Sequence, residues 1–197
     1  MKQRKRLVFG IILLSITIIV AAFLTYRYTR PPFEVPAELV QTAQTGDLIL
    51  CEGRSLKSDF VRFIGTSRKS EWSHIGIARK DASGRLWMIH MSSDEKHFIQ
   101  QPIEDYVLTS RVQKLGLWRL TPSIDTTALM TRLDAIGREG KEFDGDFDIK
   151  DDSRWYCTEM LYRLLPEFGI SVSELQLDGE YLYPVAFTTW THTKRVY

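Results

Sequence analysis

Residues 7 to 25 form an uncharged, almost wholly apolar run, and the six residues before it include four lysines and arginines. An α-helix of roughly 20 apolar residues is long enough to cross a bilayer. Because basic residues beside such a segment tend to stay in the cytoplasm, they favour a cytoplasmic N-terminus. We therefore expect residues 1–30 to be a membrane anchor, with the remainder periplasmic or extracellular. A cleaved signal segment is the alternative, since Val20, Ala21 and Ala22 are small, and cleavage would leave the protein secreted.

The rest of the chain has the size of one ordinary domain. We expect a linker over residues 31–44 and a single domain over residues 45–197. The sequence is 44% hydrophobic with a formal net charge of +1. This balance is typical of a globular protein and gives no indication of a nucleic-acid partner.

Apolar periodicity and turn residues predict strands and helices in the domain. The expected strands cover residues 47–51, 98–100 and 112–120, together with two runs on either side of a turn at residues 81–84. The expected helices cover residues 57–64 and 103–108, a segment capped by Ser123 or Asp125 that ends near Gly137 to Gly140, and a segment around Cys157. Antiparallel strands beside segregated helices make the expected fold class α+β.

Two histidines flank the turn at residues 81–84. His74 and His90 are separated by an even number of positions, sixteen (90 − 74). In the simplest antiparallel register, centred on Ala82, they lie directly opposite each other on one face of the hairpin, and Gly76 lies opposite Met88. Opposed Cβ atoms are roughly 5 Å apart, which permits a hydrogen bond between the two imidazoles. A slip of one residue would put them on opposite faces. The alternative interpretation is that each histidine merely ends a strand.

Cys157 precedes apolar residues at helical spacing that continue toward Gly169, and Asp151, Asp152 and Ser153 are candidate N-caps. Cys157 is thus expected in the first turns of a helix. There, free backbone N–H groups and the helix dipole favour the thiolate and can hold an oxyanion. A thiol nucleophile with one histidine as base and another as orienting group is the arrangement of a cysteine hydrolase. The alternative for Cys157 is a small core residue.

The second cysteine, Cys51, ends the expected strand at residues 47–51. Outside the cytoplasm it could form a disulfide with Cys157, which would remove the proposed nucleophile. We expect instead a thiol buried in the core.

Three segments together resemble a known family. They are Gly46-Asp47-Leu48-Ile49-Leu50, Trp72-Ser73-His74-Ile75-Gly76-Ile77 and Tyr156-Cys157-Thr158-Glu159-Met160-Leu161-Tyr162. In this order they resemble the circularly permuted papain-like enzymes of the YiiX/YaeF type, relatives of the NlpC-type cell-wall amidases. The resemblance covers roughly residues 45–169 and implies a permuted papain-like fold, with an antiparallel sheet packed against helices.

The resemblance also implies roles for particular residues. Cys157 corresponds to the nucleophile, His74 to the general base and His90 to the third, orienting residue. The further candidates for substrate binding or the oxyanion site are Asp47, Trp72, Ser73, Tyr156 and Glu159.

The expected function is therefore that of a cysteine hydrolase, an amidase or peptidase acting on envelope peptides or peptidoglycan, without a cofactor. One alternative is a lipid ester hydrolase or acyltransferase, because the lecithin:retinol acyltransferase group shares the permuted arrangement and this chain carries an apolar segment. Another is an envelope binding module that has lost catalysis. Oligomeric state is not indicated.

The sequence offers two candidate metal sites, but each lacks part of the pattern it requires, and we expect no bound metal ion. The carboxylates at residues 144, 146 and 148 are spaced as in a calcium loop, but Ile149 and Trp155 occupy the positions expected for its glycine and glutamate. His74, His90 and Cys157 are suitable zinc ligands, without the paired-cysteine spacing of a zinc site.

Overall fold

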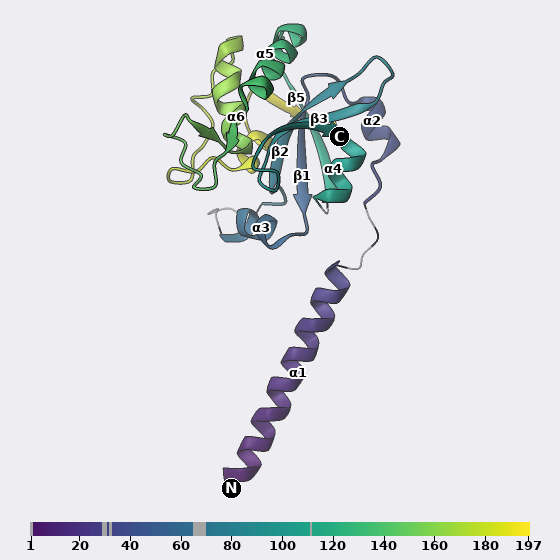
Figure 1. Ribbon diagram of the computed structural model, residues 1–197, viewed down its shortest axis with the longest axis vertical. Coiled ribbons are helices and arrows are strands. Elements are labelled where there is room, and N and C mark those ends of the chain that lie inside the picture. The colour runs from purple at the N-terminus through teal and green to yellow at the C-terminus, as the bar shows by residue number, and fades with distance from the viewer. Residues whose placement is uncertain (1, 29–30, 32, 65–69, 111) are drawn as a thin grey trace. The chain divides into compact units, whose positions relative to one another are not determined.

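The computed structural model describes residues 2–28, 31, 33–64, 70–110 and 112–197. It divides the chain into two compact units, residues 1–32 and 33–197, each of which is described by itself. The first unit contains the helix α1 (Lys2–Tyr28; Figure 1). Within it, Phe9–Tyr26 is long and apolar enough to cross a membrane.

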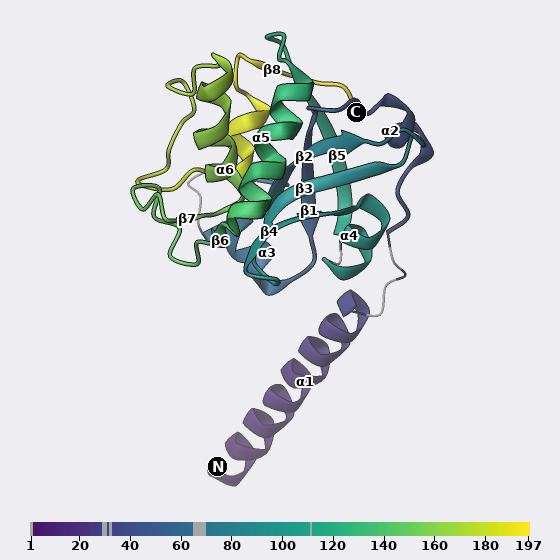
Figure 2. The ribbon, with the colours of Figure 1, turned by 45° about the horizontal axis from the view of Figure 1, so that its top comes forward.

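The second unit is built on an eight-stranded sheet in the order β7-β6-β4-β3-β2-β1-β5-β8 (Figure 2). The strands are β1 (Leu48–Gly53), β2 (His74–Lys80), β3 (Leu86–Ser92), β4 (His97–Pro102), β5 (Val112–Leu120), β6 (Glu142–Phe143), β7 (Arg154–Trp155) and β8 (Thr193–Arg195). Neighbours are antiparallel except β6 and β7, which are parallel. The expected strands at residues 47–51, 98–100 and 112–120 are confirmed as β1, β4 and β5.

Helices cover both faces of this sheet (Figures 1 and 2). They are α2 (Ala37–Thr42), α3 (Leu56–Asp59), a π-helix (Phe60–Ile64), α4 (Ile103–Thr109), α5 (Thr126–Glu139), α6 (Cys157–Leu164) and 3₁₀ turns at Leu165–Phe168 and Pro184–Thr188. One apolar core joins Leu50 and Ile75 of the sheet to α5 and α6. A second joins Ile49 and Met88, on the other face, to α2 and α4. The predicted α+β class is confirmed.

The histidine hairpin differs from the predicted register by two residues. β2 and β3 pair Ala78 with Met88 and Lys80 with Leu86, so their partners sum to 166 rather than 164. The cause is Asp81, whose carboxylate accepts hydrogen bonds from the backbone N–H groups of Ser83 and Arg85 and thereby centres the turn on Ser83. The prediction of directly opposed histidines is wrong. A shift of two residues nevertheless keeps both on the same face.

The helix ends agree only in part with the sequence. Asp125 caps α5 through the N–H groups of Thr127 and Ala128, and Gly140 ends it with a left-handed backbone, as expected. α6 begins at Cys157 as predicted, but its N-cap is Tyr156, not residues 151–153, because β7 intervenes. The expected helix at residues 57–64 is divided between α3 and the π-helix. Within the stretch expected to be a linker, Leu39 of α2 is fully buried.

Candidate active site

His74 and His90 form a hydrogen-bonded pair. His74 Nε2 lies 2.9 Å from His90 Nδ1, and the rings cross at 89°. Gly76 permits this approach: a Cβ atom there would lie 3.0 Å from His90 Cβ and 2.7 Å from the carbonyl oxygen of Ile89. Because Gly76 has no side chain, the His90 ring can lean diagonally across the hairpin to His74, two residues away.

Two residues that the sequence reasoning missed contact this pair. The ring of Tyr106, on α4, stacks on His74 at 5.8 Å and meets His90 edge-on at 5.0 Å between centroids. Gln101 Nε2, on β4, lies 2.9 Å from His90 Nε2. Both residues reach the histidines only because β4 pairs with β3 and α4 follows β4, so no local motif could have indicated them.

Cys157 is the first residue of α6, which packs against β2 and β3. Its sulfur accepts hydrogen bonds from the backbone N–H groups of Ile75, Thr158 and Cys157 itself. Ile75 directly follows His74, so the thiol is tied to the start of the strand that carries the first histidine. The thiol also interacts electrostatically with Tyr106, the ring stacked on His74. The structure thus places all three predicted catalytic residues around the start of β2.

Burial shifts the pKa values of Cys157, His74 and His90 in the direction that favours their neutral forms. Desolvation raises the pKa of Cys157 to about 11, although its three backbone N–H partners act in the opposite direction. Desolvation also lowers the pKa of His74 to about 4. The pKa of His90 lies well below its ordinary value, first because of burial and then because of His74, while the Met91 carbonyl and Asp94 act in the opposite direction. The backbone N–H groups at the start of α6 favour the thiolate, as expected, but burial outweighs them, so the net shift of the Cys157 pKa is toward the neutral thiol. The shifts at His74 and His90 likewise favour the neutral imidazoles.

Tyr156 and Glu159 fix the first turn of α6. The Glu159 carboxylate accepts from the Tyr156 backbone N–H at 3.4 Å and from Arg163. Glu159 is fully buried, and desolvation raises its pKa to about 7, against the opposing effect of Arg163. The Tyr156 hydroxyl accepts from the backbone N–H of Leu182 at 3.2 Å. Both side chains are therefore engaged in positioning the helix that starts with Cys157.

Ser73 and Trp72 lie just before His74 and are buried. The Ser73 hydroxyl accepts from the Gly53 backbone N–H at 3.0 Å and donates to the Cys51 carbonyl at 3.3 Å, which joins β1 to the start of β2. Trp72 packs edge-on against Trp118 at 5.2 Å between centroids. These contacts anchor the segment that leads into His74.

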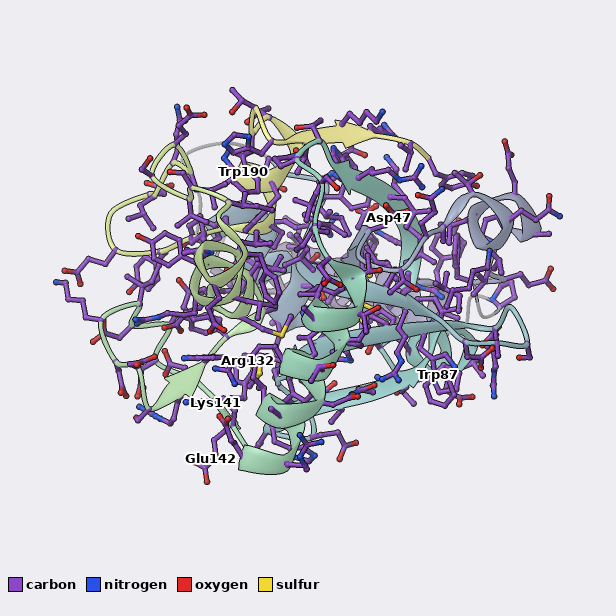
Figure 3. All side chains as sticks on the ribbon, turned by 90° about the horizontal axis from the view of Figure 1, so that it is seen from above. Asp47, Trp87, Arg132, Lys141, Glu142 and Trp190 are labelled. Carbon is purple, nitrogen blue, oxygen red and sulfur yellow. The ribbon has the colours of Figure 1, made fainter. Side chains whose placement is uncertain are left out.

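Asp47 lies away from the other candidates. It is on the turn that leads into β1 (labelled in Figure 3), whereas Cys51, at the other end of that strand, is the residue that pairs with His74. Its carboxylate accepts two hydrogen bonds of 2.8 Å from Arg119. The geometry gives Asp47 a structural connection between β1 and β5.

Cys51 is a free, buried thiol, as expected for a core residue. Burial raises its pKa to about 12, and the Tyr106 hydroxyl hydrogen-bonds it. Cys157 is also free, so the structure leaves both thiols unbridged.

Metal-ligating side chains do not gather at the site. Among the residues that the structure describes, no three His, Cys, Asp or Glu side chains are grouped so as to hold a metal ion. In the acidic loop, the buried Asp144 carboxylate instead accepts the backbone N–H groups of Asp146 and Asp148.

Comparison with known proteins identifies a matching family and a similar fold. A family model described as permuted papain-like amidase enzyme, YaeF/YiiX, C92 family, matches residues 42–196. A crystal structure described as metalloprotein yiiX from Escherichia coli O157:H7, DUF1105, superposes with a TM-score of 0.64 and 17% sequence identity, covering 79% of this chain and 97% of that one. At this identity the likeness shows a shared fold. No curated protein matches the chain.

Proposed function

The chain belongs to the YaeF/YiiX family of permuted papain-like amidases, and from this premise we propose that it cleaves amide bonds with Cys157 as the nucleophile. The observation that carries the proposal is the hydrogen-bonded pair His74 and His90 at the start of β2, where the next backbone N–H, that of Ile75, contacts the Cys157 sulfur. Acyl transfer to cysteine requires an oriented imidazole that can take the thiol proton, and we propose that His74 fills this role when the substrate is bound.

The neutral resting state sets the order of steps. As Cys157 Sγ attacks the substrate carbonyl, its proton passes to His74, and the thiolate and imidazolium arise together so that their attraction offsets desolvation. His90 holds His74 in orientation. Backbone N–H groups at the start of α6 stabilise the oxyanion.

The second half of the reaction releases the product. Protonated His74 gives its proton to the leaving amine, and the carbonyl carbon remains bound to sulfur as a thioester. His74, again neutral, then takes a proton from water as the water oxygen attacks this thioester. The acid departs and the thiol returns.

We further propose that the substrate is a peptide or peptidoglycan amide of the cell envelope. Two features support it: the family is described as amidases, and α1 includes a segment able to span a membrane. The basic residues before that segment favour a cytoplasmic N-terminus, and we propose on this basis that residues 33–197 lie on the periplasmic or extracellular side. The yiiX structure is described as a metalloprotein, but the steps proposed for this chain use only its own side chains and water.

Hydrolysis of defined substrates tests the proposal. The full chain in detergent micelles, with Cys157→Ser as the matched control, would be incubated with peptidoglycan fragments and, separately, with phospholipid vesicles. We expect new amino groups from the fragments with the unaltered chain and none with Cys157→Ser. Release of fatty acid alone would show a lipid ester hydrolase instead. No product from either substrate and no acyl-enzyme mass would leave a binding module.

A further inference from the structure

We infer that Gln101 is a positioning residue that determines which ring nitrogen of His74 carries a proton. The inference rests on the proposed function of His74 as the base. It follows from the hydrogen bonds that join three side chains across three strands, His74 on β2, His90 on β3 and Gln101 on β4.

These side chains form a diagonal row on one face of the sheet. His90 pairs with Ile99 of β4, and Gln101, two residues further on, faces the same way. On the other side, Gly76 lies beside His90, and His74 is two residues away on the same face. Each step of the row is 2.9 Å between nitrogen atoms, so each side chain is in hydrogen-bond contact with the next.

If Gln101, His90 and His74 are all neutral, only two arrangements of their protons allow both hydrogen bonds of the row to form. If the Gln101 amide donates through Nε2, His90 Nε2 accepts, His90 Nδ1 carries the proton and His74 Nε2 must accept. His74 then has its proton on Nδ1 and no free lone pair for the thiol proton. If Gln101 instead presents its carbonyl oxygen, every bond in the row reverses. His74 Nε2 then donates, and Nδ1 is left free to act as the base.

The protonated state of His74 admits only the second arrangement. An imidazolium has an N–H on both nitrogens, so His74 Nε2 must donate to His90 Nδ1. His90 Nε2 then carries a proton, which needs an acceptor at the position of the Gln101 amide. In the structure Gln101 Nε2 faces His90 Nε2, which corresponds to the first arrangement. Rotation of the Gln101 amide by a half-turn would bring Oε1 toward His90 Nε2. The hydrogen bonds then reverse, and His74 Nδ1 is free to act as the base.

Two substitutions at this position separate the arrangements, and a third is the matched control. Gln101→Glu can only accept from His90, whereas Gln101→Met has a similar volume and neither donates nor accepts a proton. Gln100→Met is the control, because Gln100 precedes Gln101 on β4 but bonds Asp134 and Arg79 instead. The Met91 carbonyl and Asp94, which also act on His90, remain in place in all three.

Two readouts on the full chain in micelles test the inference: the tautomers of His74 and His90 from ¹⁵N chemical shifts, and the rate at which iodoacetamide alkylates Cys157. In Gln101→Glu we expect a proton on Nε2 of both histidines and alkylation at least as fast as in the unaltered chain. In Gln101→Met we expect mixed tautomers and alkylation slower by at least about tenfold. Gln100→Met should match the unaltered chain in both readouts.

Tautomers that are identical in all four proteins would overturn the inference. So would tautomers that change as much in Gln100→Met as in Gln101→Met, since a general disturbance of β4 would then explain them. The tautomer readout does not depend on Cys157. If the tautomers follow Gln101 while Cys157 is alkylated at the same rate in all four proteins, the positioning inference stands and the proposed function fails.

Discussion

At the residue scale, burial acts in opposite directions on the two partners of the proposed reaction. It raises the pKa of the Cys157 thiol to about 11 and lowers that of the His74 imidazole to about 4, and both effects favour the neutral form. A neutral thiol and imidazole react slowly until a substrate binds, because the thiolate nucleophile forms only when the Cys157 proton passes to His74. A thiol held in its neutral form is less reactive toward oxidants than a thiolate.

Because the pKa of His74 is lower in the folded chain than in the unfolded chain, the free energy of unfolding depends on pH. Between its unfolded value of 6.5 and about 4, the unfolded chain binds the proton that the folded chain excludes, so stability present at pH 7 is lost as the pH falls. We expect His74→Phe to remove up to about 3 kcal/mol of this loss between pH 7 and pH 4. Urea unfolding followed by tryptophan fluorescence measures it. Equal pH dependence in the two proteins would contradict the assigned burial.

Asp47 should matter for folding and not for chemistry. It is nearly fully buried against Arg119 and lies at the end of β1 away from Cys51. We expect Asp47→Asn to lower the free energy of unfolding by about 1–3 kcal/mol, because a charge-assisted pair is lost beside a partly exposed arginine. Cys157 alkylation should stay unchanged. A selective loss of alkylation at full stability would return Asp47 to the active site.

At the scale of elements, the hairpin shows what could be predicted from the sequence. The sequence placed His74 and His90 on one face correctly, because the true register differs from the predicted one by two residues and so keeps the alternation of side chains. The register was not predictable from spacing, because the Asp81 carboxylate moves the centre of the turn by one residue. Gln101 and Tyr106 were missed because strand pairing and chain reversal, rather than sequence proximity, bring them to the histidines.

Gly76 should be essential to the pairing of the histidines. A methyl group there would meet the Ile89 carbonyl oxygen at 2.7 Å and His90 Cβ at 3.0 Å, so β3 would have to move. We expect Gly76→Ala to cost about 1–3 kcal/mol of stability. It should also change the histidine tautomers and slow Cys157 alkylation.

Gly145→Ala provides the control for this substitution, since nothing lies within 4 Å of its added Cβ. It should leave stability and alkylation almost unchanged. If Gly76→Ala behaved like Gly145→Ala, the diagonal approach of His90 over Gly76 would be wrong.

At the scale of the whole molecule, the chain combines a helix able to span a membrane with a permuted papain-like unit that matches its family over residues 42–196. The order of the segments, with the histidines before the cysteine, was readable from the sequence because each motif is local. The pairing of β6 with β4 and of β7 with β6 could not be read from the sequence, because β6 and β7 have only two residues each.

Retention of the apolar segment can be measured directly. We expect the full chain to stay in the membrane fraction after an alkaline wash, with a mass that includes residues 1–32. A shortened chain in the soluble fraction would instead show that the segment is a cleaved signal. Replacing two exposed α1 residues, Ile12 and Ile16, with arginine should release the protein, because charges at the bilayer centre are costly.

The central claim is that Cys157 reacts with the help of His74, and alkylation by iodoacetamide tests it most directly. The full chain in micelles and its His74→Ala variant would be alkylated across pH 6–10, with Cys157 and Cys51 separated by peptide mass. Cys51, whose burial raises its pKa to about 12, is the internal control. We predict that His74→Ala slows Cys157 by at least about tenfold and leaves Cys51 unchanged. Equal rates for Cys157 in the two proteins would contradict the account.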